Sequence, residues 1–169
     1  MKKSDIKKVL ATREIIIDTR EQKSQHVEKF LDSTNIPWKR EKLDSCDYSI
    51  RLPDYPELDN LVLVERKMSL DEICGNFTKG RERFTKEFER IDKNASVHLV
   101  VEKANWYDII KGNYRSRLPS KSLIASIMSF SERYNIKVWF CKRIEAPRII
   151  DNLLYYAMYN KLKNIEFKG

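Results

Sequence analysis

A carboxylate and a lysine stand two residues apart at the end of an apolar run in this sequence. The segment Leu61–Glu72 is LVLVERKMSLDE, so Glu65 and Lys67 almost directly follow an unbroken aliphatic stretch. Because side chains alternate across a β-strand, Glu65 and Lys67 are expected on one face and Arg66 on the other. Such a pair is either a structural ion pair or part of a metal-dependent phosphodiesterase, in which the carboxylate holds a divalent cation and the lysine acts on water and phosphate. The pair alone favours the structural interpretation.

Further carboxylates stand at the ends of two other predicted strands. Asp47 begins the segment DYSIRL, and Asp18 and Glu21 follow the apolar run Ile15–Ile17. Magnesium prefers several oxygen ligands, so one carboxylate is too few, but a neighbouring strand that begins at Asp47 can bring it to Glu65. Asp47 on its own is equally suited to capping a turn. Three strand ends with carboxylates together favour a metal site.

The elements that must position these residues alternate between strands and helices. We predict a mixed α/β domain, with a central sheet and helices on both sides. The predicted strands are Glu14–Asp18, Trp38–Leu43, Cys46–Leu52, Leu61–Arg66, Ser96–Glu102 and Lys137–Cys141. The second and third of them are expected to form a hairpin. The predicted helices are Ser24–Thr34, Ser69–Asp92 with a break near Gly75 or Gly80, Asn105–Gly112, Pro119–Tyr134 and Glu145–Lys163.

Composition bounds the domain organisation and the class of partner. The 169 residues suit one domain, residues 1–169, in which the charged residues 1–12 are expected to fray. The 33 Lys and Arg against 25 Asp and Glu give a net charge of +8. That excess favours a polyanionic partner, with nucleic acid ahead of an anionic membrane.

The cysteines and the hydropathy point to an intracellular protein. Cys46, Cys74 and Cys141 lie far apart without zinc-ligand spacing, so we expect reduced thiols in the cytoplasm. The two histidines, His26 and His98, are expected to be structural or surface residues. No apolar run is long enough to span a membrane, and no secretory signal opens the chain.

Several short motifs follow one another in a recognisable order. They are DTRE at Asp18–Glu21, DY at Asp47, VERK at Val64–Lys67, then Asp71, and GR at Gly80. In this order the sequence resembles the nuclease domain of the XPF family of structure-specific DNA endonucleases, over about residues 14–140. That domain has the restriction-endonuclease-like PD-(D/E)xK fold.

The resemblance implies Mg²⁺- or Mn²⁺-dependent cleavage of phosphodiester bonds in branched, flap or nicked DNA. The implied metal-binding groups are Asp47, Glu65, Glu21 and the backbone carbonyl of Arg66. The implied catalytic residues are Lys67, Glu65, Asp47 and Asp18. Arg20 and Asp71 match positions that support the site. A purely structural role for Asp71, in the first turn of a helix, is equally open.

The chain departs from the family pattern at three points. Cys46 stands where a glycine usually precedes the Asp-Tyr pair, and Thr85 where a glutamine is common. The tandem helix-hairpin-helix module and the helicase region of larger relatives are missing, which suggests a free-standing form of bacterial or phage type. Neither substitution removes an implied metal ligand.

Basic residues near the motifs are candidates for contacts with the nucleic-acid backbone. Lys79, Arg81 and Arg83 lie near the loop before the second half of the helix that follows VERK, and join Arg20 in this group. For Arg90 and Lys93, further along the same helix, a solvated helix face is the favoured interpretation. The loop Lys111–Lys121 carries Tyr114 and Arg115. Either these residues bind a nucleic-acid strand by stacking and charge, or the loop is a simple connection.

The final helix and the reaction class each leave alternatives. Residues 145–163 carry more apolar side chains than one face needs, which fits either burial on two sides or a homodimer, and dimerisation is typical of the family. The rival to a nuclease is a non-catalytic DNA-binding or scaffolding module. Such relatives have usually lost the carboxylate or the lysine, whereas Asp47, Glu65 and Lys67 are intact here. RNA as a substrate stays open.

Overall fold

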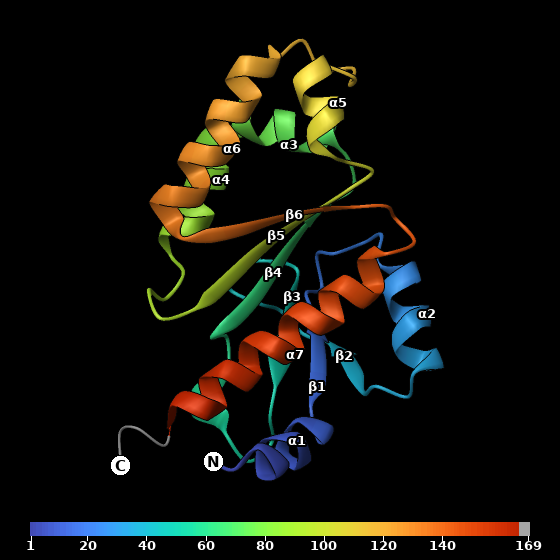
Figure 1. The fold of residues 1–169 in the computed structure, drawn as a ribbon, viewed down its shortest axis with the longest axis vertical. Helices are drawn as coiled ribbons and strands as arrows, with labels where there is room; N and C mark the ends of the chain where they lie inside the picture. Colours follow the sequence, from blue (N-terminus) through green and yellow to red (C-terminus); the bar gives the residue numbers. More distant parts are fainter. Residues whose placement is uncertain (166–169) are drawn as a thin grey trace.

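A computed structural model of the chain describes residues 1–165 (Figure 1). Within these residues, six strands form one mixed sheet in the order β2-β1-β3-β4-β5-β6. The strands are β1 (Glu14–Ile17), β2 (Trp38–Arg40), β3 (Tyr48–Arg51), β4 (Val62–Lys67), β5 (Ser96–Glu102) and β6 (Ile136–Cys141). β4, β5 and β6 are parallel, whereas β3 runs antiparallel to both of its neighbours, β1 and β4.

Helices cover both faces of the sheet, as predicted (Figure 1). One face carries α1 (Lys3–Ala11), α2 (Gln25–Ser33) and α7 (Ala146–Ile165), and the other carries α3 (Leu70–Phe77), α4 (Arg81–Glu89), α5 (Trp106–Lys111) and α6 (Ser120–Tyr134). A short 3-10 helix, Pro56–Leu58, follows β3. Each face has its own apolar core, because alternate residues of β4 point to opposite sides: Val62 and Val64 into one, Leu63 into the other. None of the helices within residues 1–165 has the length and hydropathy needed to cross a membrane.

The predicted hairpin between β2 and β3 is wrong, because β1 lies between them. Ile15, Ile16 and Ile17 are all buried, so the backbone N–H and C=O groups of β1 need hydrogen-bond partners, which β2 and β3 supply on its two edges. β2, with its half-buried and exposed residues, lies at the edge of the sheet. The chain between β2 and β3 passes the end of β1, where the Asp18 carboxylate accepts a hydrogen bond from the backbone of Leu43.

The expectation that residues 1–12 fray is also wrong. They form α1, whose Ile6 and Leu10 are buried in the core that α7 shares. Just after α1, Arg13 Nη2 lies 3.1 Å from Asp151 Oδ1 of α7. Two apolar residues at helical spacing are enough to dock the segment, despite its lysines.

The predicted helix boundaries near the motifs are confirmed. α3 begins after Ser69, whose hydroxyl accepts from the amide of Glu72 at 3.3 Å, and the Glu72 carboxylate in turn accepts from the amide of Met68. The break before α4 falls at Gly80, where an added Cβ would lie 3.2 Å from the carbonyl oxygen of Gly75. This close approach of Gly80 to Gly75 places α4 next to the end of β4.

Candidate active site

The antiparallel pairing of β3 with β4 brings two carboxylates together. Tyr48 lies opposite Val64 and Ser49 opposite Leu63, so the next residue along each strand places Asp47 beside Glu65. The amide of Asp47 donates to the carbonyl of Val64 at 3.0 Å. The Asp47 Oδ2 atom accepts from the amide of Arg66 at 2.8 Å. The predicted meeting of Asp47 and Glu65 therefore occurs.

Glu65 and Lys67 share a face of β4, as the alternation of side chains predicts. Lys67 Nζ lies 2.6 Å from Glu65 Oε1, and only 4 % of Glu65 and 7 % of Lys67 are exposed. The other carboxylate oxygen, Glu65 Oε2, is buried and has no hydrogen-bond partner. The ion pair exists, but it leaves half of the carboxylate unsatisfied, and buried polar atoms are rarely left so.

Uncompensated negative charge concentrates at this point. Burial raises the pKa of Asp47 well above its usual value, and the charges of Glu65 and Glu21 raise it further. Burial also raises the pKa of Glu65 to about 7, although Lys67 opposes the rise. Burial lowers the pKa of Lys67, but the adjacent Glu65 outweighs this and leaves it raised, so Lys67 is a cation here. Two adjacent carboxylates with raised pKa values are typical of a site that receives a cation or does proton chemistry.

A hollow of about 360 Å³ opens over these side chains. Its lining combines the end of β4, the turn before β3 and α4, and comprises Asp18, Arg20, Asp44, Cys46, Asp47, Glu65, Lys67, Asn76, Gly80, Arg83, Phe84, Glu87 and Arg90. A second hollow, of about 240 Å³, also includes Asp47 and Lys67 in its lining, together with Glu21 and Arg66. Asp47 and Lys67 therefore stand between two recesses.

Asp18 reaches the hollow, but its oxygens are already engaged. Oδ1 accepts from Arg20 Nε at 2.7 Å, and Oδ2 accepts from the amide of Leu43 at 2.6 Å. Burial would raise the pKa of Asp18, yet these hydrogen bonds hold it below its usual value. Asp18 therefore holds Arg20 and the backbone before β3 in place. Arg20, with 56 % of its side chain exposed, faces the hollow.

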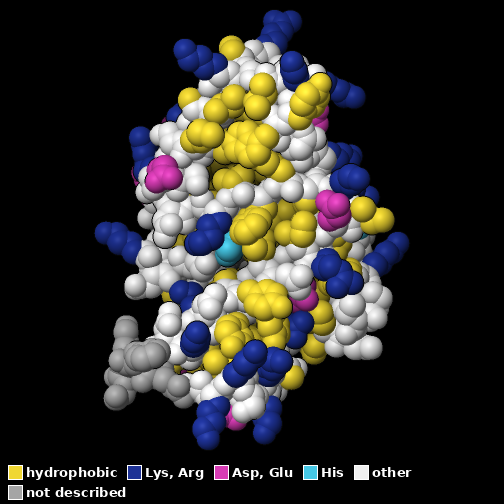
Figure 2. All heavy atoms as spheres, in the orientation of Figure 1, with side chains coloured by type: hydrophobic (Ala, Val, Ile, Leu, Met, Phe, Trp, Pro, Cys, Tyr) yellow, Lys and Arg dark blue, Asp and Glu magenta, His cyan; other side chains and the backbone are white. Residues whose placement is uncertain are grey.

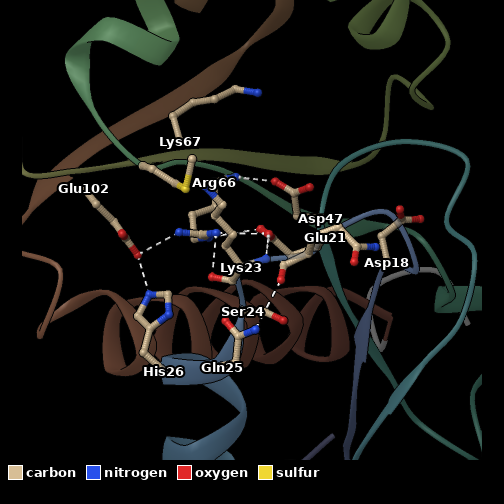
Figure 3. Close-up of polar contacts among 12 residues, drawn as sticks. Asp18, Glu21, Lys23, Ser24, Gln25, His26, Asp47, Arg66, Lys67 and Glu102 are labelled. Carbon is tan, nitrogen blue, oxygen red and sulfur yellow. Dashed lines mark hydrogen bonds and ion pairs between the residues drawn. The ribbon is translucent and has the colours of Figure 1, made fainter.

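Glu21 lies on the opposite side of β4 from Glu65. Its two carboxylate oxygens accept from Nε and Nη2 of Arg66, both at 3.0 Å (Figure 3). Within residues 1–165, no three His, Cys, Asp or Glu side chains converge as a complete metal site. Asp47 and Glu65 are the two carboxylates that lie side by side at the hollow. The roles of Asp47, Glu65, Glu21 and the Arg66 carbonyl as metal ligands stay predictions.

The predicted basic contacts divide into two groups. Arg83 lines the hollow, whereas Lys79 and Arg81 do not. The guanidinium of Arg81 donates to the carbonyl of Phe77 at 3.3 Å, at the turn between α3 and α4. Arg90, which sequence reasoning left as a solvated residue, also lines the hollow.

Glu87 is a lining residue that sequence reasoning missed. Its Oε1 accepts from the amide of Cys46 at 3.2 Å, and Cys46 has a left-handed backbone, with φ of 66°. The signal in the sequence was helical spacing, since Glu87 lies four residues after Arg83 and three before Arg90 on α4.

The basic loop after α5 is held close to the start of α3. Asp71 Oδ1 accepts from the amides of Arg115 and Ser116, both at 2.8 Å, which gives Asp71 a structural role. Tyr114 is half-buried against the core and donates its hydroxyl to the carbonyl of Leu118 at 2.8 Å. The predicted stacking role of Tyr114 is not supported, because its ring packs inward, whereas Arg115 is exposed.

Comparisons with known proteins agree with this geometry. The family described as ERCC4 domain matches residues 17–147. Two solved structures of XPF from Aeropyrum pernix, one of them in complex with DNA, superpose with TM-scores of 0.62 and 0.63 at 22% identity. They cover 85% and 86% of this chain, while this chain spans only 61% and 64% of theirs. Among curated proteins, no sequence matches this chain.

The fold and the family follow from these findings. The superposition shows that the mixed sheet and its flanking helices have the fold of the XPF nuclease domain, as the motifs predicted. The family match covers most of the chain and includes Asp18, Asp47, Glu65 and Lys67. This chain belongs to the ERCC4 domain family.

Proposed function

We propose that the protein is a divalent-metal-dependent endonuclease that hydrolyses phosphodiester bonds in DNA. One observation carries the proposal: Glu65 keeps a buried oxygen without a partner beside Asp47, while its other oxygen lies 2.6 Å from the Lys67 ammonium. A structural ion pair requires no such free oxygen. A nuclease site does, because it must hold a cation and a lysine next to the reacting phosphate.

The residues fit a magnesium or manganese ion. Asp47 and Glu65 would hold it, with the remaining positions filled by water, since Mg²⁺ typically keeps several waters and takes only one or two carboxylates. When bound, the ion supplies charge stabilisation for the phosphate and lowers the pKa of a bound water. Its positive charge would also stabilise both carboxylates in the ionised form, against the burial and the neighbouring negative charges that raise their pKa values.

The side chains of the hollow suit a phosphodiester substrate. Lys67 holds a proton at Nζ next to the carboxylates, where it can orient a water or stabilise developing charge on phosphate. Arg83 and Arg20 line the same hollow and can bind flanking phosphates. The net charge of +8 favours a polyanion throughout.

DNA is the proposed substrate, since one similar structure is that of XPF from Aeropyrum pernix in complex with DNA. We further propose selectivity for branched, flap or nicked DNA and a location in the cytoplasm, where the buried thiols of Cys46, Cys74 and Cys141 would stay reduced. A non-catalytic DNA-binding module of the same fold is the alternative.

A homodimer is also part of the proposal, through the surface formed by β6 and α7. β6 is an edge strand, and Trp139 on it and Tyr156 on α7 are 42% and 60% exposed. A largely apolar groove of about 590 Å³ lies between these elements, and Figure 2 shows hydrophobic side chains gathered on this side of the molecule. A second copy would cover this surface, which is otherwise costly to expose. The residues of α7 that face the sheet are ordinary core.

The decisive experiment incubates pure protein with labelled flap, forked, nicked, duplex and single-stranded DNAs and an RNA strand, each with Mg²⁺, Mn²⁺ or EDTA. We expect cleavage of the branched DNAs with either metal, none with EDTA, and none by Glu65→Gln. Binding without cleavage by the wild-type protein would favour the non-catalytic alternative. Light scattering at micromolar concentration tests the dimer, and a monomer throughout that range would refute it.

A further inference from the structure

A buried polar network lies behind the candidate site, on the Arg66 face of β4. Figure 3 shows Arg66 between Glu21 on one side and Glu102 on the other, while Lys67 points the opposite way. Arg66 Nη1 lies 3.2 Å from Glu102 Oε1, and Nη2 also donates to the carbonyl of Lys23 at 3.0 Å. Only 2% of the Arg66 side chain is exposed. The guanidinium therefore has partners on all three of its nitrogens.

Glu102 extends the network to α2. It is the last residue of β5, its side chain is 1% exposed, and its Oε1 lies 2.5 Å from Nε2 of His26 (Figure 3). Burial would raise the pKa of Glu102, but the hydrogen bond from His26 and the charge of Arg66 hold it below its usual value. Glu102 is therefore an ionised group that joins β4, β5 and α2.

The network reaches the proposed metal ligands through the backbone of Arg66. The amide of Arg66 donates to Asp47 Oδ2 at 2.8 Å, so the position of this residue sets the position of that carboxylate. Its guanidinium also fixes Glu21 in the loop before α2. A guanidinium held by two carboxylates and a carbonyl cannot rotate without breaking several charge-assisted hydrogen bonds at once.

We propose that Glu102 and His26 are positioning residues for the active site, which act by holding Arg66 and, through its backbone, Asp47. This inference rests on the proposed nuclease function, and it adds two residues that lie outside the motifs. Groups that orient metal ligands without touching the metal typically contribute ~10–100-fold to metal affinity or activity.

The test is Glu102→Gln, which keeps the shape of the side chain but removes its charge. We expect hydrogen exchange to become faster at the amide of Arg66 and over residues 18–24, because Arg66 is no longer held from both sides. Calorimetric titration with Mn²⁺ should show weaker binding. Single-turnover cleavage should fall ~10–100-fold, with affinity for DNA unchanged in the absence of metal.

Two kinds of control separate positioning from general stability. Asp151→Asn breaks the ion pair with Arg13, which lies between α7 and the start of β1 and is also largely buried. It should lower the melting temperature without changing exchange over residues 18–24 or the affinity for Mn²⁺. Arg66→Lys should resemble Glu102→Gln, because an ammonium cannot bridge all three partners. His26→Gln, which keeps a donor, should lie closer to wild type than His26→Ala.

The outcomes distinguish the inference from the function on which it rests. Wild-type exchange and Mn²⁺ affinity in Glu102→Gln would overturn the inference, and so would faster exchange spread evenly over the whole chain, which indicates simple destabilisation. If the wild-type protein cuts no substrate, the proposed function fails, yet the exchange measurement still decides whether Glu102 holds Arg66.

Discussion

The two faces of β4 carry polar groups of opposite character. On one face the Arg66 guanidinium is fully paired, with Glu21, Glu102 and a backbone carbonyl around it. On the other, Lys67 satisfies only one oxygen of Glu65 and the second is left buried without a partner. Both faces are buried, so exposure does not separate them. The difference lies in whether the hydrogen-bonding capacity is used up, and the unused capacity of Glu65 is the basis of the proposed cation site.

The largest effect should come from removing the unsatisfied carboxylate. Glu65→Gln keeps the size of the side chain but cannot hold a cation by charge, so we expect cleavage to fall at least ~10²–10³-fold, the loss typical of a preorganised electrostatic group. Asp47→Asn should do the same. Single-turnover assays with Mg²⁺, alongside circular dichroism to verify the fold, provide the measurement. Wild-type cleavage by Glu65→Gln would mean that the active site does not lie on the Glu65 face of β4.

Lys67→Ala should produce the next largest effect, on chemistry rather than on binding. Lys67 shares the face with Glu65 and its Nζ contacts that carboxylate, so its loss should slow the chemical step ~10²-fold or more. The affinity for DNA and its dependence on salt should stay unchanged. If Lys67→Ala binds DNA poorly yet cuts at the normal rate once DNA is saturating, Lys67 acts in DNA binding and not in the chemical step.

His98 tests the behaviour of a buried group without a counter-charge on the Arg66 side of the sheet. Burial, with a smaller contribution from Lys137, lowers the pKa of His98 to about 4, and its Nδ1 accepts from Trp139 Nε1 at 3.0 Å. The unfolded chain therefore binds this proton first, and stability should fall as the pH drops from about 6.5 towards 4.

The expected loss of stability follows from the size of the pKa shift of His98. At about 1.4 kcal/mol for each pKa unit, the acid-dependent loss due to His98 is at most about 3.5 kcal/mol. His98→Gln should flatten this part of the profile, as measured by urea unfolding at several pH values. An unchanged slope between pH 6.5 and 4 would show that His98 is not the group responsible.

Arg83→Ala should have the smallest of these effects and act on DNA binding alone. Arg83 is exposed at the rim of the hollow, so its loss should weaken affinity and make the salt dependence shallower by about one unit of slope. The matched control is Lys86→Ala on the same helix, because Lys86 pairs with Glu82 at 2.6 Å and does not line the hollow. Equal losses of affinity in the two variants would show that Arg83 has no specific contact.

Local features of this protein were predictable from the sequence. The alternation of Glu65, Arg66 and Lys67 follows from strand geometry, and the start of α3 at Ser69 and the end of α5 at Gly112 follow from capping preferences. The order of the motifs identified the family. In each case the determining interactions span only a few residues, so the sequence carries them directly.

The tertiary structure decided which groups are satisfied. β1 lies between β2 and β3 because the backbone groups of its three buried isoleucines need hydrogen-bond partners on both edges. This order brings Leu43 next to Asp18. Arg66 forms an ion pair with Glu102 on β5, and Glu102 also pairs with His26 on α2. These pairs have no spacing rule, because a buried charge is stabilised by whichever groups the packing brings to it. The sequence therefore determined which residues can do chemistry, and only the fold decided which of them are left free to do it.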